Sequence, residues 1–333
     1  MPKPIQPDNI TNIAVFRTDR IGEVLLSTVC ISALKNYFPK SRIIFITSDY
    51  AKDIVSGRSD IEEVFIFNTL AGQNSLLRFF KLISYLKRKR VDLAVILNPH
   101  KLLHMGCFLA GIKYRLGYDR KWAFCLTHKI EDKKGESVKH EAEYNLDLLE
   151  AVGVKAKYEP FFDIAVSAQD SDYIARALNQ SGLDNARPII AIHPGSSNPL
   201  KVWPKKHFSL LIKKLKAGLD CNIVLIGSMD DKGVISKIVS ECKDAVYDLS
   251  GSFTIKQLFC FFKSCKAFIG NDAGPMHIAA SAGIPVIALF GSASSPARWR
   301  PWGRGHIVLH KDRIEDISVD EVVEAVKSIE QRA

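Results

Sequence analysis

One short segment carries groups that could bind a phosphorylated sugar. The apolar run 267–269 predicts a buried strand, 270–274 predicts a turn, and 275–282 predicts a helix. The start of a helix presents unpaired backbone N–H groups and the positive end of a dipole, so this turn suits a phosphate or diphosphate. An acid beside an anion is favourable when it binds hydroxyls, as a sugar would supply. The segment therefore predicts a sugar-diphosphate site, made by Asp272, Ala273, Gly274, Pro275 and His277.

Two of these residues have simpler interpretations. Asp272 could be a helix N-cap, a position where short polar residues are common. His277 could be a core histidine that is hydrogen-bonded to a carbonyl. Both alternatives are compatible with the sequence.

Two more loops follow predicted strands in the same half of the chain, at 193–197 and 227–231. Parallel strands point the same way, so we expect these loops and 271–274 to gather on one sheet edge. Ser196 and Ser197 can donate to phosphate oxygens, Lys201 can reach the same charge, and Asp230 or Asp231 suits a ribose hydroxyl. Neither a GxGxxG nor a Walker motif occurs, which argues against NAD binding and ATP hydrolysis.

The elements that would position these loops form two series of alternating strands and helices. A linker is expected at 154–168, where helical periodicity is lost. The pattern predicts an α/β protein with two Rossmann-like domains whose parallel sheets face an interdomain cleft, one over 1–160 and the other over 168–317. The first series has strands at 12–16, 42–47, 63–68 and 92–98, shorter strand-like pieces at 113–130, and helices at 23–37, 75–90 and 141–152. After a helix that ends at 182, the second series has strands at 188–193, 222–227, 246–249, 267–269 and 285–290 with helices at 205–218, 231–242, 254–265, 275–282 and 318–330.

Composition limits the partners and the compartment. The chain has 333 residues, 47% of them hydrophobic, and a net charge of +10 that favours anionic partners. A basic cluster at 87–90 could contact such a partner or simply be a solvated helix end. Seven cysteines without a CxxC pair suit reduced, buried thiols. With neither a signal peptide nor a membrane-spanning run in the sequence, we expect a cytoplasmic protein.

Four segments together resemble the ADP-heptose:lipopolysaccharide heptosyltransferase family. They are 20–26 (RIGEVLL), 193–197 with 201–204 (HPGSS and KVWP), 270–277 (GNDAGPMH) and 289–291 (LFG). The resemblance implies a GT-B fold of glycosyltransferase family 9, with the donor in the C-terminal domain and inverting, metal-independent transfer. It implies a nucleotide-diphosphate heptose, ADP-heptose, as donor and a lipid-anchored inner-core saccharide of lipopolysaccharide as acceptor. The terminal helix 318–330 would pack back onto the first domain.

Carried over by position, the resemblance assigns roles to single residues. Ser196, Ser197 and Lys201 would contact the donor phosphates, Asp231 the ribose, and Phe253 the adenine. The catalytic base would be Glu23, where the family usually has aspartate. Asp19 is the rival base, and without the resemblance Glu23 is equally an acid that is favoured at a helix start.

No cofactor or metal is expected. The DxD pattern at Asp170 and Asp172 lies at a helix start and indicates a cap. The expected partners are the donor, the acceptor and an anionic membrane surface, and not nucleic acid, so the protein would be peripheral at the inner face of the cytoplasmic membrane. The alternatives are another nucleotide-sugar enzyme, such as an epimerase or a transferase with a different donor, a non-catalytic binding protein, and, least favoured, an NAD oxidoreductase.

Overall fold

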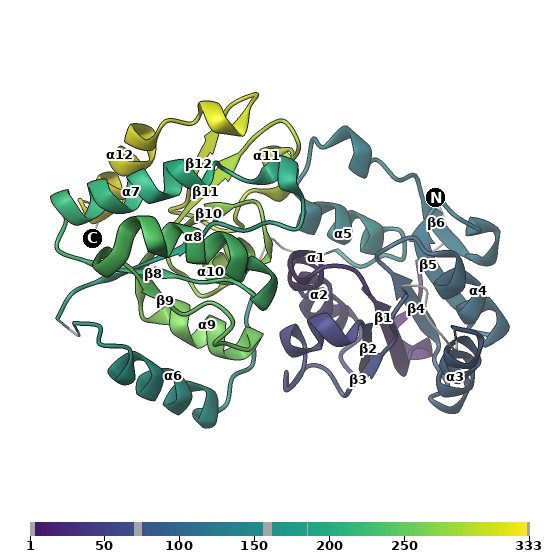
Figure 1. Ribbon diagram of the computed structural model, residues 1–333. Coiled ribbons are helices and arrows are strands. Elements are labelled where there is room, and N and C mark those ends of the chain that lie inside the picture. Colours follow the sequence, from purple (N-terminus) through teal and green to yellow (C-terminus); the bar gives the residue numbers. More distant parts are fainter. Residues whose placement is uncertain (1–3, 70–74, 156–161, 185, 332–333) are drawn as a thin grey trace. The chain divides into compact units, whose positions relative to one another are not determined.

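The computed structural model of the chain describes residues 4–69, 75–155, 162–184 and 186–331. Contacts divide it into two compact units, Met1–Ala165 and Val166–Ala333 (Figure 1). The division falls within the segment expected to be a linker. Each unit is built on its own parallel sheet.

The first unit contains a six-stranded parallel sheet with the order β3-β2-β1-β4-β5-β6. The central strand β1 is apolar and buried along most of its length, as a strand covered on both faces must be. The strands are β1 (Asn12–Phe16), β2 (Arg42–Thr47), β3 (Glu63–Ile66), β4 (Leu93–Ile96), β5 (Tyr114–Tyr118) and β6 (His128–Ile130).

Helices connect the strands of this sheet. Those on one face, α3 and α4, share an apolar cluster with β1, β2 and β4. The α-helices are α1 (Ile21–Ser27), α2 (Val29–Tyr37), α3 (Ser75–Arg88), α4 (Lys101–Leu109) and α5 (Glu141–Glu150), and the 3-10 helices are η1 (Pro7–Asn9), η2 (Asp49–Ile54), η3 (Ala123–Cys125) and η4 (Lys134–Glu136).

The single helix predicted over 23–37 is divided in the structure at Thr28. The hydroxyl of Thr28 donates to the carbonyl of Leu25 at 2.7 Å, and that of Ser27 donates to the carbonyl of Glu23 at 2.7 Å. Such hydroxyl bonds compete with the regular backbone ladder and interrupt helices. The result is a short helix, α1, with Glu23 in its first turn.

The second unit contains another six-stranded parallel sheet, with the order β12-β11-β10-β7-β8-β9. Its strands are β7 (Ile189–His193), β8 (Asn222–Leu225), β9 (Tyr247–Asp248), β10 (Cys265–Asn271), β11 (Val286–Phe290) and β12 (Ile307–His310). Its helices are α6 (Ala168–Gln180), α7 (Lys205–Gly218), α8 (Lys232–Cys242), α9 (Ile255–Lys263), α10 (Gly274–Ser281), α11 (Pro296–Trp299) and α12 (Val319–Glu330), with 3-10 helices η5 (Pro199–Lys201), η6 (Met229–Asp231), η7 (Lys243–Ala245) and η8 (Ile314–Asp316).

The terminal helix α12 is part of the core of the second unit. It lies beside α7 and against β11 and β12 (Figure 1), and its packing onto the first domain stays a prediction. Its apolar face joins the core cluster that contains β7, β8 and β10. That face consists of Val319, Val322, Ala325, Val326 and Ile329. Since these side chains are already buried there, the second unit holds the helix.

The structure also tests the predictions for the cysteines and for the DxD pattern. All seven cysteines are free and buried, as predicted. Asp170 forms a capping box with Ser167, so the DxD pattern is a helix cap. In the described ranges, none of the helices has both the length and the apolar character that crossing a membrane requires.

Candidate active site

Three loops meet at the carboxyl ends of β7, β8 and β10, which are neighbours in the second sheet. The buried side chain of Asn271, at the end of β10, joins that strand to the loop after β7. Its Nδ2 donates to the carbonyl oxygens of Pro194 at 3.0 Å and Gly195 at 3.3 Å, and its Oδ1 accepts from the backbone N–H of Trp203 at 3.0 Å. Sequence reasoning had assigned no role to Asn271, which holds the predicted phosphate loop against the predicted sugar loop.

Lys201 and Asp272 form an ion pair. Lys201 Nζ lies 2.5 Å from Asp272 Oδ2, and the hydroxyl of Ser294 donates to the same oxygen. The Asp272 side chain is 6% exposed and that of Lys201 is 17% exposed. The interpretation of Asp272 as a helix cap is wrong, because the N-cap of α10 is Ala273 and no side chain caps this helix. A lysine and an aspartate predicted to contact different parts of one donor thus lie in direct contact.

His277 lies in the first turn of α10, which has Pro275 near its start and Gly274 as its first residue. Among the described residues its Nδ1 has no hydrogen-bond partner, so the interpretation as a carbonyl-bound core histidine is not supported. Burial lowers the pKa of His277 to about 4 although the nearby Asp272 carboxylate acts in the opposite direction. The imidazole is therefore neutral at neutral pH, with Trp299 at its edge and one ring nitrogen ready for a partner.

Asp231 is the last residue of η6 and directly precedes α8. Its Oδ2 accepts from the N–H and the hydroxyl of Ser228, both at 2.7 Å, and lies 3.6 Å from His193 Nε2. Burial would raise the pKa of Asp231, but His193 and Ser228 outweigh it and bring the value to about 2. A Cβ atom at Gly195 would lie 2.0 Å from Asp231 Oδ1, so only glycine leaves room for this carboxylate.

The remaining predicted donor contacts surround this edge. Ser196 is half-buried and lies near the backbone of Asp272, with its hydroxyl 3.5 Å from the Asp272 carbonyl. Ser197 is exposed in the same loop. Phe253 follows β9 and stacks on Phe261 with ring centroids 5.2 Å apart. Asp230 is exposed in η6 beside Asp231.

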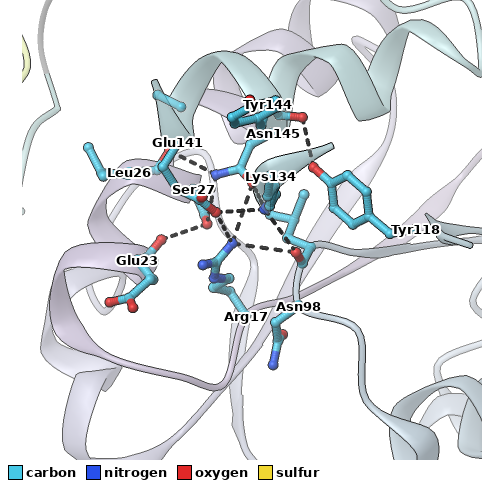
Figure 2. Close-up of polar contacts among 12 residues, drawn as sticks. Arg17, Glu23, Leu26, Ser27, Asn98, Tyr118, Lys134, Glu141, Tyr144 and Asn145 are labelled. Carbon is cyan, nitrogen blue, oxygen red and sulfur yellow. Dashed lines mark hydrogen bonds and ion pairs between the residues drawn. The ribbon is translucent and has the colours of Figure 1, made fainter. Parts of the chain in front are cut away.

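In the first unit, a buried network of charges underlies Glu23 (Figure 2). Arg17 Nη1 and Lys134 Nζ both contact Glu141 Oε1, at 3.0 and 2.6 Å. Arg17 Nε also donates to Asp19 Oδ1 at 2.7 Å. Burial would lower the pKa of Arg17, but Asp19 and Glu141 raise it above its ordinary value, so the guanidinium stays charged.

Asn145 connects this network to α1. Its Oδ1 accepts from Lys134 at 3.1 Å, and its Nδ2 donates to the carbonyl of Leu26 and the hydroxyl of Ser27, each at 3.4 Å. The Ser27 hydroxyl in turn donates to the backbone carbonyl of Glu23. Sequence reasoning missed Arg17, Lys134, Glu141 and Asn145, because residues so far apart in the chain give no joint signal.

The Glu23 carboxylate points away from this network (Figure 2). Burial, reinforced by the negative charge of Asp19, raises its pKa above the ordinary value for glutamate. No side chain in the described ranges is hydrogen-bonded to it, whereas Asp19 is bonded to Arg17. A half-buried carboxylate with a raised pKa is the kind of group that can accept a proton during a reaction.

Within the residues that the structure describes, no group of three or more His, Cys, Asp or Glu side chains is placed to hold a metal ion.

Comparison with known proteins identifies the family. Residues 79–324 match the family described as Glycosyltransferase family 9 (heptosyltransferase). The chain belongs to this family. The prediction of a glycosyltransferase is thereby confirmed, in preference to an epimerase, a binding protein or an oxidoreductase.

Relatives and solved structures agree with that assignment. This family 9 glycosyltransferase is 27% identical over 298 residues to lipopolysaccharide heptosyltransferase 3 of Escherichia coli, covering 86% of this chain and 85% of the relative. Its structure resembles that of a family 9 glycosyl transferase from Veillonella parvula DSM 2008, with a TM-score of 0.90 at 20% identity and 99% of both chains covered. It also resembles ADP-heptose lps heptosyltransferase II of E. coli, with a TM-score of 0.82 at 23% identity, covering 97% of this chain and 100% of that one. These structural similarities show the fold, and the predicted GT-B fold class is confirmed.

Proposed function

We propose that this family 9 glycosyltransferase transfers heptose from ADP-heptose to an inner-core saccharide of lipopolysaccharide. Its similarity to lipopolysaccharide heptosyltransferase 3 supports the class of donor sugar and acceptor. The observation that carries the donor assignment is the Lys201–Asp272 pair beside the amino end of α10. It combines a cation for a diphosphate with a carboxylate for sugar hydroxyls.

In this proposal the donor exchanges partners with the ion pair. The diphosphate takes the ammonium of Lys201, and the carboxylate of Asp272 turns to the sugar hydroxyls while Ser294 holds it. Backbone N–H groups at the start of α10 and the hydroxyls of Ser196 and Ser197 share the phosphate charge. A lysine and a helix start supply the positive charge that a metal supplies elsewhere, so we propose that transfer is metal-independent.

The other donor contacts keep the roles that the resemblance gave them. Asp231, ionised and fixed by Ser228, accepts from ribose hydroxyls. The half-buried ring of Phe253 lies against the adenine. The orphaned Nδ1 of neutral His277 forms a hydrogen bond with the donor sugar or diphosphate.

Glu23 serves as the base in this proposal. Its carboxylate removes the proton of the acceptor hydroxyl as the hydroxyl oxygen attacks the anomeric carbon and ADP leaves. A single displacement of this kind inverts the anomeric configuration. Glu23 has a raised pKa, and no side chain in the described part of the chain is hydrogen-bonded to its carboxylate. Both features favour it over Asp19, which is bonded to Arg17.

The acceptor determines the proposed location. A saccharide that is anchored to lipid is reached at a membrane surface, so we propose a protein that is peripheral at the cytoplasmic face of the inner membrane. The first unit would receive this acceptor, because it carries the proposed base.

A panel of nucleotide sugars tests the donor assignment. A ligand that binds only the folded protein raises the melting temperature. ADP-heptose is expected to raise it more than UDP- or GDP-sugars at equal concentration, and Lys201→Ala is expected to remove most of the difference. Equal stabilisation by every nucleotide sugar, or none by ADP-heptose, would refute the assignment.

A further inference from the structure

The outer face of α3, α4 and η3 in the first unit exposes large apolar side chains. Leu76 is 72% exposed, Phe80 61% and Phe124 72%. Together these side chains form what we call the apolar face: Leu76, Leu77, Phe80, Phe108, Leu109, Trp122 and Phe124. Large exposed apolar patches on soluble domains are typical of interaction sites.

These side chains lie on one side of the unit. The buried sides of α3 and α4, with Ala123 of η3, share one core cluster on the same face of the sheet. The opposite sides of these elements therefore point outward together, and Figure 1 shows α3 beside α4. On α3, Leu77, Phe80, Lys81 and Lys87 recur at the spacing of a single helical stripe.

Cations are interleaved with the apolar side chains. Lys101 Nζ lies 5.6 Å from the centre of the Trp122 ring, and the Trp122 and Phe124 rings are 6.3 Å apart. Phe108 lies seven residues after Lys101 on α4, and the guanidinium of Arg115, from β5, is 5.4 Å from the centre of its ring. Aromatic rings that are paired with cations in this way suit a boundary between apolar and charged surroundings.

The charge of this region is predominantly positive. Residues 64–125, which include the whole apolar face, contain eleven Lys and Arg residues and two acids, Asp92 and Asp119. Asp92 accepts from the backbone N–H groups of Thr11 and Asn12, and Asp119 is paired with Lys129, so both acids are engaged within the fold. Most of the net charge of +10 of the whole chain is concentrated here. The partner of this face must therefore be both anionic and apolar.

We infer that the apolar face docks on an anionic lipid membrane, with its aromatic and leucine side chains entering the headgroup boundary and the surrounding lysines contacting lipid phosphates. A membrane fits better than a nucleic acid, because stacked bases engage aromatic rings but offer little to Leu76, Leu77 and Leu109. The sequence alone suggested only the cluster at 87–90. In the structure Lys89 of that cluster is paired with Glu63, and the exposed Lys81 and Lys87 adjoin the apolar residues.

This inference rests on the proposed function in that a lipid-anchored acceptor gives membrane docking a purpose. It can nevertheless be tested without donor or acceptor. The full chain is mixed with vesicles of phosphatidylethanolamine and phosphatidylglycerol, or of phosphatidylcholine alone, and sedimented at low and high salt. We expect binding to the anionic vesicles only, weakened but not abolished by salt, because charge is screened and apolar insertion is not.

Two double variants identify the surface. Phe80→Ser with Phe124→Ser removes apolar area, and Lys81→Gln with Lys87→Gln removes charge; each pair is expected to weaken vesicle binding by about tenfold or more. All four side chains are exposed, so the fold should be unaffected. The matched controls lie on exposed positions of the second unit, Leu210→Ser for the apolar change and Lys213→Gln with Lys237→Gln for the charge change, and should bind like the wild type.

Several outcomes would overturn the inference. Wild-type binding by the Phe80/Phe124 variant would show that charge alone holds the protein to vesicles. A wild-type dimer that the same variant converts to a monomer would assign the face to a second copy of the chain. Binding to RNA in preference to vesicles would assign it to nucleic acid.

Transfer to a delipidated acceptor separates this inference from the proposed function. The Phe80/Phe124 variant should transfer heptose to that acceptor at the wild-type rate, since neither residue belongs to the proposed active site. If the wild type binds vesicles but transfers nothing, the proposed function fails and the docking surface stands. If transfer occurs and vesicle binding does not, the docking inference fails alone.

Discussion

The two units each contain a lysine paired with a carboxylate, but the surroundings of the pairs differ. In the first unit, Lys134 and Arg17 share Glu141, whose side chain is 0% exposed, and Lys134 also donates a hydrogen bond to Asn145 Oδ1. In the second, Lys201 is 17% exposed and its aspartate has one hydroxyl as its other side-chain partner. Breaking a fully buried pair leaves uncompensated charge, whereas a pair near the surface can exchange partners at modest cost. We interpret the first cluster as structural support for Glu23 and the second as a site that a charged ligand can open.

The largest effect is expected at the residue that the first cluster supports. Glu23→Gln keeps the size and hydrogen-bonding reach but loses the base, so kcat should fall by roughly 10² to 10⁴ while donor affinity is nearly unchanged. Because the pKa of Glu23 is raised, the acid limb of the wild-type pH–rate profile should lie above the ordinary range for glutamate. Asp19→Asn is the matched control and should cost little. Wild-type transfer by Glu23→Gln together with an inactive Asp19→Asn would move the base to Asp19.

Glu141→Gln tests whether the first cluster is structural. It leaves Arg17 and Lys134 buried with one fewer negative partner, so the free energy of unfolding should fall by roughly 3 to 5 kcal/mol. Asp147→Asn on the same helix removes an exposed pair with Lys139 and should cost less than about 1 kcal/mol. Urea denaturation measures both. Similar small losses would mean that burial does not distinguish the two pairs.

His277 gives a pH test of the second cluster. Its pKa is about 4 in the folded protein, against about 6.5 in the unfolded chain. The unfolded chain binds this proton first, so stability should fall as the pH drops from about 6.5 to about 4, by up to about 3 kcal/mol. His277→Gln should remove that part of the slope in denaturation curves. An unchanged slope would show that His277 titrates normally and is not buried as described.

Lys201→Ala should have the smallest effect on the fold and a selective effect on binding. Loss of the ammonium should weaken donor affinity at least tenfold, about 1.4 kcal/mol, in calorimetric titration with ADP-heptose. Lys213→Ala, an exposed lysine on α7, is the control. Unchanged affinity in Lys201→Ala would remove this lysine from the donor site and with it the proposed exchange of partners.

Local sequence signals predicted local structure well. Thr254 with Gln257 and Ser318 with Glu321 form capping boxes, which Ser or Thr followed three residues later by Glu or Gln typically indicates. The strand, turn and helix around 267–282 could also be predicted, because an apolar run, a glycine-rich turn and a proline near the helix start lie within a few residues. The repetition of such units predicted two Rossmann-like domains, and the resemblance to the heptosyltransferase family implied the GT-B fold.

Contacts between distant residues could not be predicted in this way. Arg17 and Glu141 are 124 positions apart, and Lys201 and Asp272 are 71 apart. Each of these charged residues is compatible with a solvated surface when considered alone. The amphipathic pattern of α12 indicated a helix but not its contacts with α7, β11 and β12. Among the α-helices and strands, three were missed: α4, which contains Gly106, the short helix α11, and β12, which is only partly buried.

Transfer of labelled heptose from ADP-heptose to a delipidated core acceptor tests the central claim most directly. We predict that the wild-type protein forms the glycosylated acceptor with the anomeric configuration inverted, at a rate that a chelator does not reduce. Retention of configuration would contradict the single displacement, and loss of activity with a chelator would contradict metal independence. Absence of product from ADP-heptose while another nucleotide sugar is transferred would contradict the function proposed for this chain.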